Sequence, residues 1–108
     1  MTPEKKVKNK VVALLKDAGA YCFYPVAGGF GSAGIPDIIA CYMGRFFAIE
    51  CKAGKGKTTA LQDRNIAQIK DAGGLAIVVN EENLIEVQEI LDYIAQEEKD
   101  KWALLQTK

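Results

Sequence analysis

Apolar side chains recur along this chain with two different periods, and the changes of period predict its elements. In the first segment, Thr2 is a suitable N-cap, Pro3 suits the first helical turn, and Gly19 provides a stop signal. The apolar residues between them follow helical spacing: Val7, Val11, Leu14, Leu15 and Ala18. The pattern therefore predicts a first helix from just after Thr2 to just before Gly19.

Four later segments are typical of strands. Residues 20–26 form a short aromatic run, and a glycine-rich stretch follows it. Residues 36–42 and 45–52 are two apolar runs separated by Met43-Gly44, a compact hairpin signal. Residues 75–79 are continuously apolar and mostly β-branched, which is typical of a strand buried on both faces.

Two further helices complete the pattern. One is capped by Thr58 or Thr59 and ends at the glycine pair after residue 72, with apolar positions at Leu61, Ile66 and Ile69. The last carries Leu84, Val87, Leu91 and Ile94. Beyond it, residues 97–101 are expected to be a charged surface stretch and residues 102–106 an apolar patch. The predicted order is αβββαβα, an α/β fold in which strand–helix–strand implies a parallel pair.

Composition restricts the possible classes of function. With 108 residues, we expect one domain spanning residues 1–108. The absence of histidine excludes Ser-His-Asp and Cys-His catalysis and histidine-bound zinc. The cysteines Cys22, Cys41 and Cys51 lie in apolar surroundings, so we expect buried free thiols in a reducing compartment. No run is long enough for a membrane helix, and the N-terminus lacks a signal-like apolar stretch, so we expect a cytoplasmic protein without a membrane partner.

The net charge is zero, but the charges are segregated along the chain. Residues 1–80 hold 11 of the 14 Lys and Arg residues and 6 of the 14 Asp and Glu residues. This basic part suits a phosphate-bearing partner, although a solvated surface with an acidic last helix explains the same distribution.

Three charged residues lie at the ends of the predicted hairpin. Asp37 opens the first apolar strand, while Glu50 and Lys52 close the second. Side chains alternate along a strand, so Glu50 and Lys52 point the same way, and the hairpin brings Asp37 beside them. Two carboxylates are hard ligands suited to Mg²⁺, and a lysine can neutralise developing negative charge. A buried Glu50–Lys52 ion pair with Asp37 capping a turn explains the spacing equally well.

The segment "GIPDIIACYMGRFFAIECK", residues 34–52, resembles the PD-(D/E)xK nuclease signature, in which a Pro-Asp strand precedes a Glu-x-Lys strand. The whole chain resembles stand-alone viral members of the VRR-NUC branch (virus-type replication-repair nuclease) over most of residues 2–80. The resemblance implies a restriction-endonuclease-like core with a central mixed sheet flanked by helices. Because the resemblance is to viral members, a viral protein that acts in the cytoplasm of its host is one of the possibilities.

The resemblance assigns roles to individual residues. Asp37 and Glu50 would hold Mg²⁺ or Mn²⁺ with the backbone carbonyl of Cys51, and Lys52 would be the catalytic lysine. Gln62 matches a helical glutamine that assists the active centre, and Glu4 matches an acid of the first helix. We expect phosphate contacts from the Gly-Ser loop and from the basic part flanking the catalytic strand end: Ser32, Lys55, Lys57 and Arg64.

The expected function is metal-dependent DNA cleavage, selective for branched DNA such as four-way junctions, by a homodimer. Such a short chain is better suited to recognising the shape of DNA than its sequence. The apolar residues Trp102, Leu104 and Leu105 and the last helix are the expected dimer contacts. Alternatives are a non-catalytic nucleic-acid-binding module, a monomeric flap or single-strand nuclease whose tail folds back on its core, and a small protein adaptor.

Overall fold

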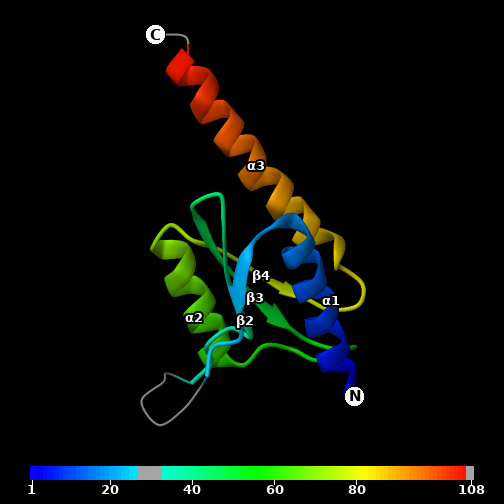
Figure 1. Cartoon of the computed structure of the whole chain (residues 1–108). Helices are drawn as coiled ribbons and strands as arrows, with labels where there is room; N and C mark the ends of the chain where they lie inside the picture. The colour runs from blue at the N-terminus through cyan, green and yellow to red at the C-terminus, as the bar shows by residue number, and fades with distance from the viewer. Residues whose placement is uncertain (27–32, 107–108) are drawn as a thin grey trace.

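The computed structural model describes residues 1–26 and 33–106, and its elements follow the predicted order αβββαβα (Figure 1). The elements are α1 (Pro3–Ala18), β1 (Tyr21–Phe23), β2 (Ile38–Tyr42), β3 (Arg45–Cys51), α2 (Ala60–Asp71), β4 (Leu75–Val79) and α3 (Ile85–Gln106). The prediction of an α/β fold with a mixed sheet flanked by helices is confirmed.

The four strands form one sheet in the order β1-β2-β3-β4. The β1–β2 and β2–β3 pairs are antiparallel, and the β3–β4 pair, connected through α2, is parallel. Tyr42 pairs with Arg45, so Met43 and Gly44 form a two-residue hairpin turn. Both turn residues have positive φ, 48° and 79°, the backbone that a type I′ turn requires.

Helices cover both faces of the sheet (Figure 1). The helices α1 and α3 pack together and against one face, while α2 packs on β3 and β4 from the other. The main core lies between α1, α3 and the sheet. Its buried side chains are Val7, Val11, Leu15, Ile38, Ala40, Phe47, Ile49, Cys51, Val79, Val87, Leu91 and Ile94.

Helix capping agrees with the sequence signals. The Thr2 side chain accepts a hydrogen bond from the Lys5 amide at 3.2 Å, and Gly19 ends α1 in the left-handed conformation with φ of 86°. At the start of α2, Thr59 rather than Thr58 is the N-cap. Its hydroxyl accepts from the Gln62 amide, and the Gln62 side chain accepts from the Thr59 amide, which completes a capping box.

The last helix is longer than the sequence pattern suggested. Residues 97–106, predicted as a charged stretch and an apolar patch beyond a helix, continue α3 without interruption. These residues are good helix formers without glycine or proline, and Gln96 donates to Asp100 one turn later at 3.0 Å. The distal half of α3 extends away from the body of the molecule, whose longest dimension is 50 Å (Figure 1).

Three smaller expectations were wrong. The first strand covers only Tyr21–Phe23 of the expected residues 20–26. Cys41 is exposed because it alternates away from the core face, whereas Cys22, opposite Ala40 on the edge strand β1, packs half-buried against the core, so only Cys51 is a fully buried thiol. Val78 is exposed since β4 is an edge strand. Within residues 1–26 and 33–106, no helix is long and apolar enough to cross a membrane.

Candidate active site

The hairpin register brings the two predicted carboxylates together. Ile38 pairs with Ile49 and both are buried in the core, so the preceding and following positions, Asp37 and Glu50, come opposite each other beyond that pair. Their side chains alternate away from those of Ile38 and Ile49, and at this end of the sheet they lie within reach of charged side chains of α1. Adjacent strands thus hold two acids at one end of the sheet.

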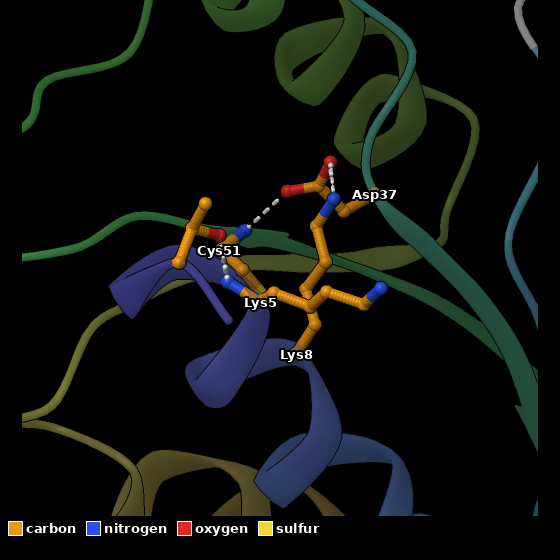
Figure 2. Close-up of polar contacts among 5 residues, drawn as sticks. Lys5, Lys8, Asp37 and Cys51 are labelled. Atoms are coloured by element: carbon orange, nitrogen blue, oxygen red, sulfur yellow. Dashed lines mark hydrogen bonds and ion pairs between the residues drawn. The ribbon is translucent and has the colours of Figure 1, made fainter.

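Both oxygens of Asp37 have a partner (Figure 2). The Cys51 backbone amide donates to Asp37 Oδ2 at 2.9 Å, and Lys8 Nζ lies 3.3 Å from Oδ1. The amide bond fixes the carboxylate against the end of β3, while Lys8 approaches it from α1. Asp37 is therefore held by the strand next to it and by a helix from a distant part of the sequence.

Glu50 has the opposite environment. It is 2 % exposed, and its Oε2 atom has no hydrogen-bond partner. Burial raises the pKa of Glu50 to about 8, with a further contribution from the neighbouring Asp37 carboxyl and an opposing one from Lys52. A buried carboxylate oxygen without a donor is costly, and a bound cation is one arrangement that satisfies it.

Lys52 follows β3 and is half-buried. Its backbone amide donates to the carbonyl of Val79 at 2.9 Å, which extends the contact between β3 and β4 past the strand end. The ion pairs among the described residues join Lys8 to Asp37 and Arg45 to Glu97. The described residues therefore do not form the buried Glu50–Lys52 ion pair of the alternative interpretation.

The helix α1 adds an acidic and a basic side chain to the charged residues at this end of the sheet. Glu4 is half-buried in the first turn, close enough to contribute to the raised pKa of Glu50. Lys8 is one turn further along the same side of the helix. Burial lowers the pKa of Lys8, but the charge of Asp37 and its hydrogen bond outweigh burial, so the pKa is raised overall.

Gln62 belongs to the first turn of α2, where its side-chain oxygen accepts from the Thr59 amide at 2.9 Å. It thus helps to begin α2. Its role in an active centre stays a prediction.

The basic loop between β3 and α2 is anchored from the β4–α3 connection. The Glu81 carboxylate accepts hydrogen bonds from the Gly54 amide at 2.9 and 3.2 Å. Lys55 and Lys57 in this loop are exposed, as is Arg64 on α2. Their phosphate contacts remain predictions, and Ser32 lies outside the described residues.

The donor set fits a hard divalent cation. Burial raises the pKa of the Cys51 thiol to about 12, so at neutral pH this residue can offer its backbone carbonyl but not a thiolate. No group of three or more His, Cys, Asp or Glu side chains suited to a metal occurs in residues 1–26 and 33–106. Two carboxylates with one carbonyl leave room for the waters that Mg²⁺ normally keeps.

Sequence reasoning did not identify two of these residues. Lys8 comes one turn after Glu4, and this spacing on a helix already inferred to carry a site acid was the available signal. Glu81 gave no signal, because its contact with Gly54 depends on how β3 and β4 pair.

This fold, with two acids opposite each other at the end of its central strands, is the restriction-endonuclease-like fold that the resemblance to PD-(D/E)xK nucleases implied. The model of the archaeal Holliday junction resolvase (Hjc) family matches residues 5–99, and the chain belongs to that family. Residues beyond 99, in distal α3, lie outside this match.

Two solved structures share the fold. A VRR_NUC domain covers 82% of this chain and 97% of its own length, with a TM-score of 0.67 and 17% identity. The Holliday junction resolvase Hjc of Archaeoglobus fulgidus covers 70% of this chain, with a TM-score of 0.55 and 21% identity. This chain spans 66% of that resolvase, just under two thirds. Among curated protein sequences, none matches this chain.

Proposed function

We propose that this protein is a Mg²⁺- or Mn²⁺-dependent DNA endonuclease that cuts branched DNA such as four-way junctions. Membership of the Holliday junction resolvase family supports the substrate class. The observation that carries the catalytic part is the position of Glu50. Its buried Oε2 has no hydrogen-bond partner and stands beside Asp37 at the sheet end, which is the environment of a cation ligand.

In this proposal, Asp37, Glu50 and the Cys51 carbonyl hold the cation. When bound, the cation would lower the pKa of a water and shield charge on the phosphodiester. The Cys51 amide orients Asp37 through its 2.9 Å bond, and burial keeps bulk water away from Glu50. These residues thus provide a fixed, partly desolvated pair of carboxyl groups.

Lys52 would act on the phosphate. Its ammonium is close enough to Glu50 to lower the pKa of that acid, so it belongs to the same electrostatic site. A positive charge there can stabilise the negative charge that develops on the phosphate oxygens, or orient the attacking water. Glu4 and Gln62 would support turnover from α1 and α2 without holding the reacting atoms.

DNA would lie across the basic surface next to this site. The Glu81 anchor holds the loop that carries Lys55 and Lys57, and Arg64 follows on α2. Contacts of this kind neutralise phosphates without reading bases. They suit an enzyme that selects its substrate by shape.

Two symmetric cuts require two active centres, so we propose a homodimer. Distal α3 is the proposed contact. Counting helical turns, Trp102 and Leu105 continue the face that carries Val87, Leu91 and Ile94 in the core, yet they are 58% and 60% exposed. Distal α3 extends away from the core (Figure 1), which supports a contact with a second copy of the chain.

Cleavage of labelled DNA tests the proposal. Linear duplex, flap, single-stranded and four-way junction DNAs are incubated with Mg²⁺, Mn²⁺ or EDTA, with Glu50→Gln as the matched control. We expect metal-dependent cleavage that favours the junction. Undiminished cleavage in excess EDTA contradicts the metal mechanism. Binding of junctions without cleavage in any metal supports the non-catalytic module, and a preference for flaps or single strands supports the alternative nuclease.

A further inference from the structure

The ion pair between Lys8 and Asp37 occupies an atom that a metal would need. Lys8 Nζ is 3.3 Å from Asp37 Oδ1, and the side chains are 29% and 21% exposed (Figure 2). The other oxygen, Oδ2, accepts from the Cys51 amide. Asp37 is thus doubly partnered, whereas Glu50 Oε2 beside it is not partnered at all.

The two acids have different partners because of the position from which the Lys8 ammonium reaches the site. Lys8 extends from α1, a helix fixed in the core by Val7 and Val11, and it reaches the more open acid. A divalent cation shared by Asp37 and Glu50 would lie beside both carboxylates. An ammonium at 3.3 Å from Asp37 and a doubly charged ion at the same carboxylate would repel each other strongly.

We propose that Lys8 is a resident counter-ion that the divalent cation displaces from Asp37. This inference rests on the proposed metal site and adds a residue that regulates it. In the metal-free protein, Lys8 neutralises the charge of Asp37. Metal binding then becomes an exchange of one cation for another, so the protein binds metal more weakly than its two acids alone would allow.

The surface around Lys8 has space for the displaced ammonium. Lys8 also lines a cavity of about 390 Å³ on the exposed side of α1, together with Thr2, Glu4, Lys5, Asn9 and Tyr24. An ammonium that moves there stays next to the site and adds to the charge of Lys5. A DNA phosphate entering the cavity would meet both lysines.

Metal binding without DNA tests the exchange. Mn²⁺ is titrated into the wild type, Lys8→Met, Lys8→Arg and Lys6→Met, and electron paramagnetic resonance measures the Mn²⁺ that stays free. Lys6 is the matched control, an exposed lysine on the same helix that does not line the cavity. Lys8→Met should bind Mn²⁺ about three- to tenfold more tightly, as expected for a part-buried ion pair. Lys8→Arg and Lys6→Met should stay close to the wild type.

Two further measurements separate direct contact from general electrostatics. The gain in Lys8→Met should persist in 0.5 M salt, because screening weakens distant charges more than a close pair. In EDTA, Lys8→Met should melt at a lower temperature than Lys6→Met, and saturating Mn²⁺ should reverse the order. Unchanged or weaker Mn²⁺ binding by Lys8→Met overturns the inference while leaving the nuclease proposal intact. Absence of Mn²⁺ binding in both the wild type and Lys8→Met overturns this inference and the nuclease proposal together.

Discussion

Asp37, the residue before β2, lies opposite Glu50 in β3, although like charges placed opposite each other destabilise a sheet. The Cys51 amide and Lys8 stabilise Asp37, while Glu50 is buried without a partner for Oε2. The protein therefore tolerates an unfavourable pair at the end of its central strands. Such strain is typical of functional sites, and it makes the pair accessible to experiment.

Removing the charged groups of the site should abolish cleavage without unfolding the protein. Asp37→Asn, Glu50→Gln and Lys52→Met should each lower the single-turnover rate by about 100-fold or more, the usual loss for a group that stabilises developing charge. Circular dichroism melts should show that each variant is folded. A folded Glu50→Gln protein with wild-type cleavage would contradict the assignment.

The pH dependence of stability should report Glu50 directly. Its folded pKa, about 8, is above the ordinary value of 4.5. A raised pKa means that the folded state binds the proton more tightly than the unfolded state. This contribution to stability is complete below about pH 4.5 and is lost as pH rises toward 8.

Glu50→Gln removes this pH dependence. In EDTA at pH 8.5 the variant should be more stable than the wild type by roughly 2–4 kcal/mol, since one pKa unit corresponds to about 1.4 kcal/mol. The difference should vanish near pH 4.5. Urea denaturation across this range measures it, with Glu89→Gln on the exposed face of α3 as a control for a generic Glu/Gln difference. A constant difference at all pH values would show that Glu50 titrates normally.

The basic surface should control affinity for DNA and its salt dependence. Alanine at Lys55, Lys57 and Arg64 should weaken binding of all DNA sequences and lower the slope of log K against log salt by up to about 2.7. A control triple variant removes three exposed charges elsewhere, Lys16, Lys70 and Lys99. Fluorescence anisotropy in Ca²⁺ is the measurement, and equal slopes for the two triple variants would identify the loop lysines as ordinary solvated groups.

The exposed apolar residues of distal α3 should determine the oligomeric state. Trp102→Glu with Leu105→Glu should convert a dimer to a monomer in light scattering at micromolar concentration. The matched control is Ile85→Glu, because Ile85 is 66% exposed on the same helix but near its other end. A wild-type monomer, or a dimer that survives the double substitution, would exclude this interface.

Gly34 should be intolerant of a side chain for two reasons. Its φ is 82°, and an added Cβ would lie 2.5 Å from the carbonyl carbon of Leu61 in the first turn of α2. Gly19→Ala is the matched control, because its φ is 86° but nothing lies within 4 Å. Gly34→Ala should cost more than Gly19→Ala, which itself should cost about 1 kcal/mol. Equal losses in thermal unfolding would show that α2 can shift.

The order of elements was predictable because each boundary had a local signal. Thr2 and Gly19 bracket α1, and Met43-Gly44 turns the hairpin. The continuity of α3 was missed because its surface pattern changes at residue 97, where the helix leaves the core and no longer needs a buried stripe. Hydrophobic periodicity reports packing, so it fades where packing ends.

The site was only partly predictable from the sequence. Asp37 and Glu50 follow from strand alternation and hairpin register, which are local. Lys8 depends on how α1 packs across the sheet end, a contact between residues 29 positions apart in sequence. Gln62 was linked to the active centre by family resemblance, while the T-x-x-Q spacing with Thr59 was a readable capping signal with a different meaning.

The length of α3 has a geometric consequence for a dimer joined through its tip. Figure 1 places the N-terminal turn of α1 and the C-terminal turn of α3 at opposite ends of the molecule. Arg45 binds Glu97 at 3.2 Å where the helix leaves the body, and the remaining residues to Gln106 rise about 14 Å beyond it. The length of α3 would then determine the separation between the two cleavage sites, because adding or removing helical turns changes this separation without altering either site.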